Sequence, residues 1–294
     1  MMIFDFTKYK KTNTYYGGSE KKFGISINNQ EYMLKFRKYN SFGEKTNNHI
    51  SEYIGSHVFE LLGFNVQETY LGTYKNEEVV ACKNFITSGY HFVPFNDVGE
   101  STSEQDKDKY QYSYDDIMKM LKDNSKLTNV NETIEVFWNM YVVDALLGNF
   151  DRHGSNWGFL KKDNEYKLAP IFDNGSCLFP RIVSEEMMIN IMNSDEETNK
   201  RIYTLPTSQI KLDNQKSSYY DVISSMKYKE CNDAIARLYS KFKQDKINSM
   251  IDDIDLISTV QKEFYIYMIK ERFNKIIKNT YDKLKVKNYE KNSD

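Results

Sequence analysis

The first part of the chain alternates apolar and polar residues in two places. The segment FGISINNQEYMLKF alternates on both sides of Asn28 and Asn29. A period of two indicates half-buried strands, and paired asparagines favour a tight turn, so this segment predicts a hairpin. The segment VQETYLGTYKNEEVVACKNF repeats the pattern and predicts a second hairpin that turns near residues 75–77. Between them, HISEYIGSHVFELLGF spaces its apolar residues three or four apart, which predicts a helix that ends at Gly63.

The helical period takes over after a polar stretch, NDVGESTSEQDKDKYQ, which is typical of a linker or an exposed loop. YDDIMKMLKD predicts a short helix. NETIEVFWNMYVVDALLGN predicts a longer helix, apolar enough to be buried, with Gly148 at its end. NWGFLKKDNEYKLAPIFD predicts a hairpin that turns at Asp163 and Asn164, and the remaining chain is mostly helical, with a last long helix from about Leu256.

These elements predict an α+β fold with two lobes. Residues 1–95 would form a small β-rich N-lobe, and residues 96–294 a larger, mostly helical C-lobe. A chain of 294 residues is longer than one hydrophobic core usually serves, which also favours two bodies. A cleft between two such lobes is a natural place for a ligand.

Composition narrows the classes of partner. The net charge of −2 gives no general attraction to nucleic acid or anionic lipid, so neither is an expected partner. No apolar run is long enough to span a membrane, and the first residues lack the pattern of a signal peptide. The three cysteines (Cys82, Cys177 and Cys231) form no CxxC pair, which disfavours a disulfide framework or a zinc site. The sequence therefore predicts a cytoplasmic protein, with export by a non-classical route left open.

The segment LGNFDRHGSNWGFL follows the predicted buried helix and carries the candidate chemistry. Asp151 lies in a loop, Asn156 follows five residues later, and Asp173 stands at the far end of the hairpin. The open ends of paired strands lie side by side, so Asn156 and Asp173 are expected to be neighbours. An amide oxygen and a carboxylate suit Mg²⁺, which leaves coordination sites for phosphate oxygens. Asp151 could then accept a proton from an attacking hydroxyl group.

Protein kinases use this division of labour among an Asp, an Asn five residues later and a more distant Asp. His153 could be a second base, but with Asp151 two residues away we expect it to brace the loop. Arg152 could pair with a carboxylate or a phosphate, or lie solvated on the surface. A single Asp or Asn in a loop is usually a turn or capping residue, and it is the combination and spacing that favour catalysis.

Three features of the N-lobe suit a nucleotide. Gly17, Gly18 and Ser19 precede a strand, where glycines let backbone N–H groups approach phosphates, although such a pair can also be a plain turn. Lys35 alternates with apolar residues on the next strand, where a kinase places its phosphate-binding lysine, although a strand lysine is more often solvated. Glu52 lies off the apolar stripe of the predicted helix, so it could pair with Lys35 or face water.

The strand VVACKNF ends where the polar stretch begins. This is the hinge position of a kinase, and the backbone groups of Lys83 to Phe85 could pair with adenine there.

Taken together, GNFDRHGSNWGF and LAPIFDNGSCL resemble the catalytic and metal-binding motifs of the HipA-like serine/threonine kinases. GGSEKKFGI, YMLKF, SEYIGSHVFELLGF and VVACKNF are similar to the phosphate loop, lysine strand, helix and hinge of that family, in the same order. The resemblance spans about residues 12–290 and is to the compact single-chain branch, without the extra N-terminal subdomain of the toxins. The chain departs from the general kinase pattern, since no H-R-D precedes Asp151 and Asn174 and Gly175 follow Asp173 in place of D-F-G.

The resemblance implies a bilobal protein-kinase-like fold, ATP with Mg²⁺, and phosphoryl transfer to Ser or Thr of a protein substrate. The implied roles are a base at Asp151, metal ligands at Asn156 and Asp173, a phosphate contact at Lys35, and adenine contacts at Lys83 and Phe85. Autophosphorylation is a further expectation, at Ser19 or within residues 174–200. Two other functions stay open: a lipid or small-molecule kinase, which the acidic segment PRIVSEEMMINIMNSDEE disfavours, and a nucleotide-binding pseudokinase that serves as an interaction module. The protein substrate and the oligomeric state are not indicated.

Overall fold

The computed structural model describes residues 3–17, 20–98, 112–122 and 129–291. These residues form a mixed α+β structure with two compact units. Unit 1 comprises Met1–Thr87, Pro170–Asn193 and Gln244–Ile266, and unit 2 comprises Ser88–Ala169, Ser194–Lys243 and Tyr267–Asp294. Each unit is therefore assembled from three separate stretches of the chain, and the lobe boundary at residue 95 stays a prediction.

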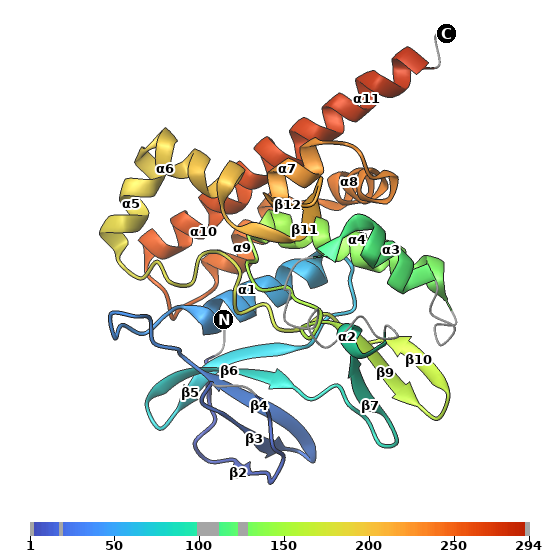
Figure 1. Ribbon diagram of the computed structural model, residues 1–294. Helices are drawn as coiled ribbons and strands as arrows, with labels where there is room; N and C mark the ends of the chain where they lie inside the picture. The colour runs from blue at the N-terminus through green and yellow to red at the C-terminus, as the bar shows by residue number, and fades with distance from the viewer. Residues whose placement is uncertain (1–2, 18–19, 99–111, 123–128, 292–294) are drawn as a thin grey trace. The chain divides into compact units, whose positions relative to one another are not determined.

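Unit 1 contains a six-stranded sheet with the strand order β1-β5-β6-β4-β3-β2, drawn in blue to cyan in Figure 1. The strands are β1 (Phe4–Asp5), β2 (Lys10–Lys11), β3 (Lys22–Ile27), β4 (Gln30–Phe36), β5 (Thr69–Tyr74) and β6 (Glu77–Lys83). The helices are α1 (Asn48–Leu61), α5 (Glu185–Asn193), α9 (Gln244–Asp252) and the first part of α10 (Thr259–Arg272).

Both predicted hairpins of unit 1 are confirmed, and asparagines shape their turns. Asn28 and Asn29 join β3 to β4 with φ of 50° and 63°, and Lys75 and Asn76 join β5 to β6 with φ of 50° and 64°. Two consecutive left-handed residues form the turn whose twist matches that of paired strands. Asn tolerates this backbone region better than most residues, so the turn chemistry and the strand pattern agree.

The two faces of this sheet bury different side chains. One face carries an aromatic-rich core, whose buried members are Phe6, Ile25, Leu34, Phe36, Tyr74, Val79 and Ala81. The opposite face packs against α1, where Ile54 and Val58 are fully buried. Because side chains alternate along a strand, Lys35 lies on the α1 face, opposite to its neighbours in β4.

Unit 2 contains two three-stranded sheets, with the strand orders β10-β9-β7 and β12-β11-β8. The strands are β7 (His91–Pro94), β8 (Tyr112–Ser113), β9 (Gly158–Lys162), β10 (Glu165–Leu168), β11 (Thr207–Leu212) and β12 (Gln215–Ser218). The α-helices are α2 (Phe95–Val98), α3 (Tyr114–Lys122), α4 (Val130–Leu147), α6 (Asp195–Asn199), α7 (Tyr219–Ser224), α8 (Lys229–Lys241), α11 (Asn279–Lys291) and the end of α10. Two π-helical stretches are η1 (Lys200–Thr204) and η2 (Phe273–Lys278).

Helix α4 is the buried centre of unit 2, as its apolar sequence predicts, and it packs against α8 and η2. The buried guanidinium of Arg272 donates from Nε to the backbone oxygen of Ala145 at 2.6 Å. The helix ends at Gly148, whose φ is 60° and whose N–H donates to the backbone oxygen of Asp144. Glycine reaches this left-handed region without a Cβ clash, so the helix stops here and the loop with Asp151 begins.

The hairpin predicted around Asp163 is confirmed, since β9 pairs with β10 in antiparallel register. Two other pairings in unit 2 were not expected from the sequence. The chain forms a β11–β12 hairpin through Asp213 and Asn214, with φ of 51° and 62°, in a region expected to be mostly helical, and β7 pairs with β9. Strands β7 and β12 have four residues each, and β11 carries only Ile210 and Leu212 as apolar residues, so their period is weak.

The predicted polar linker, residues 96–111, begins within α2. Its residues 99–111 lie outside the described part of the chain. No helix in the described ranges combines the length and apolar character that a bilayer span requires.

Gly158 permits a close approach between β9 and the end of β7, which generates a stability prediction. A Cβ added there would lie 2.3 Å from the backbone oxygen of Val93 and 3.0 Å from the backbone nitrogen of Phe95. Backbone atoms move less readily than side-chain tips, so we expect Gly158→Ala to lower the free energy of unfolding by about 1–3 kcal/mol in a urea titration. A Cβ at Gly17 meets nothing within 4 Å, so Gly17→Ala is the matched control and should change it by less than about 0.5 kcal/mol. Equal urea midpoints for the two variants would contradict the close approach of β9 to the end of β7 at Gly158.

Candidate active site

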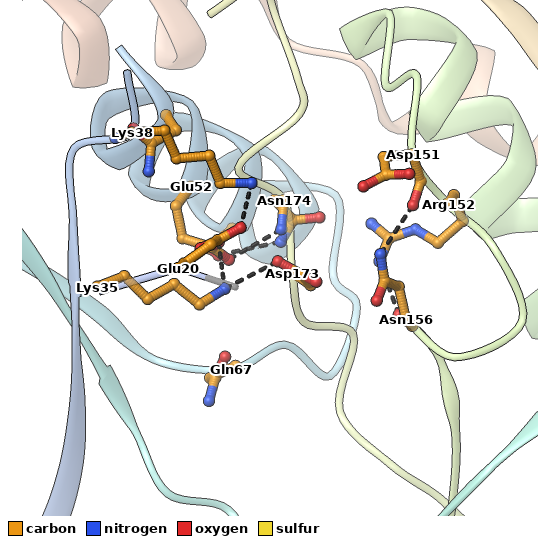
Figure 2. A network of polar contacts seen from close by, with 12 residues as sticks. Glu20, Lys35, Lys38, Glu52, Gln67, Asp151, Arg152, Asn156, Asp173 and Asn174 are labelled. Carbon is orange, nitrogen blue, oxygen red and sulfur yellow. Dashed lines mark hydrogen bonds and ion pairs between the residues drawn. The ribbon is translucent and has the colours of Figure 1, made fainter. Parts of the chain in front are cut away.

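The centre of the site in unit 1 is a buried lysine held between two carboxylates. The Nζ atom of Lys35 donates to Oε2 of Glu52 at 2.7 Å and to Oδ1 of Asp173 at 2.8 Å (Figure 2). Lys35 is 5% exposed and Glu52 is 1% exposed. The contacts join three parts of the chain, since the lysine is on β4, Glu52 is on α1 and Asp173 follows the β9–β10 hairpin in sequence.

The carboxylates decide the protonation of this lysine. Burial by itself would lower the pKa of Lys35, but the charges of Asp173 and Glu52 together raise that pKa well above its ordinary value. The ammonium group therefore stays positive throughout the physiological range. Burial raises the pKa of the nearby Cys82 thiol, and the charge of Glu52 adds to the shift, so this side chain stays a neutral thiol.

Asp173 is positioned by the chain that precedes it. Ile171 forms a parallel bridge with Val66, and its backbone oxygen accepts from the backbone N–H of Gln67 at 2.8 Å. Asp173 itself has φ of 58°, a left-handed conformation that Asp adopts more readily than most residues. The segment is therefore tied to the start of β5 just before it presents its carboxylate.

Glu52 organises the residue after Asp173 as well. Its Oε1 accepts from the backbone N–H of Asn174 at 2.8 Å, while its Oε2 accepts from Lys35. The Asn174 side chain donates to Oγ of Ser56, one turn further along α1, at 3.1 Å. Glu52 thus links the strand that carries Lys35 to the segment that holds Asp173, and both of its carboxylate oxygens accept a hydrogen bond.

Part of the glycine segment that precedes β3 is described. Gly17 is described and has open space where a Cβ would be, whereas Gly18 and Ser19 lie outside the described residues. Glu20, two residues before β3, forms an ion pair with Lys38 (Figure 2). The following residue, Lys21, donates to Oε1 of Glu77 at 2.5 Å.

The candidate hinge residues lie at the end of β6. The backbone N–H of Lys83 donates to the backbone oxygen of Glu68 at 2.9 Å, and its own backbone oxygen accepts from Nε2 of Gln67 at 2.9 Å. The ring of Phe85 lies against that of Phe172, with 5.4 Å between the ring centroids. Gln67 was not identified from the sequence, because only the pairing of β5 with β6 brings it to Lys83.

In unit 2, a buried ion pair shapes the loop that carries Asp151. Nε of Arg152 donates to Oδ2 of Asp144 at 2.9 Å, and its NH1 donates to the backbone oxygen of Asn156 at 3.0 Å. Asp144 is fully buried on α4 and also accepts from Nδ2 of Asn149 at 2.9 Å. Of the interpretations left open for Arg152, the solvated surface residue is wrong, since its partner is a carboxylate in the core. Sequence reasoning missed Asp144, although an acid within the apolar last turns of that helix, MYVVDALL, was a usable signal.

The loop presents the Asp151 carboxylate while tying down its backbone. The backbone oxygen of Asp151 accepts from the N–H of His153 at 2.9 Å and from Nδ2 of Asn156 at 2.8 Å. The Asp151 side chain remains 47% exposed. Nδ1 of His153 accepts from the N–H of Ser155 at 3.2 Å, while its Nε2 lies 3.9 Å from the Asp151 carboxylate. His153 therefore makes the local contacts expected of a brace.

The predicted site residues thus form two sets. Lys35, Glu52 and Asp173 meet within unit 1, and Asp151, His153 and Asn156 meet within unit 2. The neighbourhood of Asn156 and Asp173 stays a prediction. Asn156 is suited to a metal in one respect: its amide nitrogen is committed to the Asp151 carbonyl, so its amide oxygen is the end left to coordinate.

Comparison with known proteins identifies related chains. The family model described as the HipA-like C-terminal domain matches residues 14–255. The serine/threonine-protein kinase CtkA of Helicobacter pylori is 40% identical over 283 residues, which cover 93% of this chain and 86% of that protein. A crystal structure of the proinflammatory kinase CtkA of Helicobacter pylori matches with a TM-score of 0.88 and 38% identity, over 96% of this chain and 97% of that chain.

A more distant match is HipA of Shewanella oneidensis, solved in a complex of HipA, HipB and operator DNA. It is 15% identical with a TM-score of 0.52, over 92% of this chain and 67% of that chain, and shows likeness of fold alone. The predicted α+β, kinase-like fold class and the HipA-like resemblance are confirmed by these matches.

Gly55 tests how closely α1 must approach the Asp173 segment. A Cβ there would lie 2.6 Å from Cβ of Asn174 and 3.3 Å from Sγ of Cys177. Ala is the better helix former by about 1 kcal/mol, so a freely packed helix would gain stability from Gly55→Ala. We expect the opposite, a loss of about 1–3 kcal/mol in chemical denaturation, because the collision involves a buried and hydrogen-bonded segment. A variant more stable than the parent would show that this contact is not tight.

Proposed function

The chain belongs to the family of HipA-like C-terminal domains, and we propose that it is an ATP- and magnesium-dependent serine/threonine protein kinase. The observation that carries the proposal is the buried Lys35 cation held between Glu52 and Asp173. A stable fold gains little from a lysine at this depth, because desolvation offsets most of its attraction to the carboxylates. A pre-oriented cation is useful, in contrast, where a phosphate must be bound.

The nucleotide would be held by unit 1. Lys35 would contact its phosphates, and the backbone around Gly17, Gly18 and Ser19 would approach them closely. Lys83 and Phe85 would bracket the adenine through their backbone groups. Glu52 would keep the ammonium group of Lys35 in place before the nucleotide arrives, so that binding costs little reorganisation.

The residues present fit a magnesium ion. Asp173 offers a carboxylate and Asn156 an amide oxygen whose orientation is fixed by its nitrogen, which is a donor set of the hard oxygens that magnesium prefers. When bound, the ion would neutralise charge on the transferred phosphates. The chain's own contribution is to hold these two donors on backbone segments that are hydrogen-bonded in place.

Asp151 would orient the acceptor hydroxyl and accept its proton. Its backbone is tied down by His153 and Asn156, while its carboxylate stays accessible. His153 would act as a positioning residue through the loop backbone. The lysine, the metal ligands and the base together supply positioning and electrostatics, which account for most of the acceleration of phosphoryl transfer.

A protein substrate suits this surface better than a phosphoinositide. Exposed Glu185 and Glu186 begin α5, and anionic head groups would favour lysines and arginines there. A relative named as a serine/threonine-protein kinase supports the same choice. Turnover of labelled ATP on a basic protein, compared with lipid vesicles, would separate the two substrate classes and would also exclude a pseudokinase.

Asp173→Asn should abolish activity while leaving the fold in place. Asn tolerates the left-handed backbone at φ 58° as well as Asp does, so the substitution removes charge with little backbone strain. We expect phosphate transfer from labelled ATP to fall at least about a hundredfold. Asp163→Asn is the matched control, because Asp163 is an exposed turn residue with φ of 53°. An Asp173 variant as active as this control would refute the metal-ligand role.

Autophosphorylation is a separate prediction of the same function. Ser184 is an exposed hydroxyl in unit 1, eleven positions after Asp173, whereas Ser176 is buried and Ser19 lies outside the described residues. Incubation with ATP and magnesium should add phosphoryl groups to the intact mass, and peptide mapping should place them at Ser184 or Ser19. The Asp151→Asn protein should gain none. An unchanged mass of active wild-type protein would end this prediction and leave the kinase proposal intact.

A further inference from the structure

Gln67 holds a buried acceptor to which none of the described residues donates a hydrogen bond. The residue is 6% exposed, and its Nε2 donates to the backbone oxygen of Lys83 at 2.9 Å. Its Oε1 is buried and has no hydrogen-bond partner among the described residues. Buried polar atoms of this kind are uncommon because leaving them unpaired is costly, which suggests that a ligand supplies the missing donor.

The orientation of this amide is fixed by its partner. A backbone carbonyl can only accept, so the nitrogen of the Gln67 side chain must be the atom that faces Lys83. Reversing the amide would bring two acceptor oxygens together. The Gln67 backbone is held too, since its N–H donates to the backbone oxygen of Ile171 at 2.8 Å. Oε1 is therefore a pre-oriented acceptor.

The pairing of β5 with β6 places this acceptor on the face of Lys35. Thr69 lies opposite Cys82, and the ladder continues one step further, where Lys83 donates to the backbone oxygen of Glu68. The side chains of Glu68 and Lys83 pair with each other at 2.5 Å on the other face. Alternation then puts Gln67 on the same face as Cys82, and Cys82 pairs with Met33, which shares its face of β4 with Lys35. Figure 2 shows Gln67 in the view that contains Lys35 and Asp173.

We propose that Gln67 selects adenine by accepting a hydrogen bond from its exocyclic amine. This inference rests on the proposed function and deepens it. A carbonyl oxygen accepts two hydrogen bonds, so the Lys83 oxygen can receive one amine hydrogen beside the Gln67 nitrogen, and Oε1 receives the other. Guanine carries a carbonyl oxygen at the equivalent ring position. That oxygen would face Oε1, and the amide cannot turn to donate without losing its bond to Lys83.

The test measures binding of three nucleotides to the full chain with magnesium: ATP, GTP and the ATP analogue that lacks the exocyclic amine. Wild-type protein should prefer ATP to the deamino analogue by about tenfold or more. Methionine has a similar length to glutamine and no acceptor oxygen. Gln67→Met should therefore lower the preference for ATP over the deamino analogue by about tenfold, and it should also lower the ratio of the affinity for ATP to the affinity for GTP. The deamino analogue should bind both proteins equally, which would show that the pocket is intact. Gln215→Met, on an exposed position of β12, should leave every ratio unchanged.

The outcomes separate the inference from the proposed function. If Gln67→Met binds ATP with undiminished preference over the deamino analogue, the inference is overturned while the kinase proposal stands. If the wild-type protein binds none of the three nucleotides, the proposed function fails and the inference fails with it. If Gln67→Met does not unfold cooperatively on heating, Gln67→Leu replaces it in the binding measurements. The wild-type preference for ATP over the deamino analogue then also tests the inference. Equal wild-type affinity for ATP and the deamino analogue overturns the inference on its own.

Discussion

The ion pair of Lys35 with Glu52 and Asp173 is the constraint on which the site in unit 1 depends. A buried ammonium group is tolerated only when carboxylates surround it, and here they come from a helix and from a distant segment of chain. Strand β4, helix α1 and the residues around Asp173 must therefore meet at one point. The requirement also explains why α1 carries Gly55, since a larger residue would hold the third partner away.

Unit 2 also contains a buried ion pair, and there it fixes the backbone of a loop. Asp144 and Arg152 form an ion pair inside the core. Asp144 also accepts from Asn149, and Arg152 donates to the backbone oxygen of Asn156, so the buried pair fixes the course of the loop. The carboxylate of Asp151 belongs to the same loop but remains accessible. The buried charges thus fix a backbone, and the accessible carboxylate is the group to which we assign the chemistry. A loop braced in this way can present a base in one geometry without losing its contact with solvent.

Gln67 carries an energetic cost just before the start of β5. Glu68 and Lys83 satisfy each other on one face, through their side chains and through the ladder. On the other face the amide nitrogen of Gln67 has a partner, whereas no residue in the described ranges donates to its oxygen. A fold selected for stability alone would place an apolar side chain at this position, whereas a binding site benefits from an acceptor that is already desolvated and oriented.

The sequence by itself determined the local elements and the chemical inventory of this protein. Paired asparagines with left-handed preference, alternation in the strands and the apolar run of α4 are properties of neighbouring residues, so they can be read before the chain folds. The spacing of Asp151, Asn156 and Asp173 is likewise written in the chain. Only the tertiary structure decided that Gln67 meets Lys83, that Arg152 meets Asp144, and that β7 joins β9. Arg152 lies only eight residues after Asp144, and the loop that follows Gly148 turns it back onto the helix. The other two pairings come from strand register, which depends on how distant segments share a buried surface, and no local pattern specifies that.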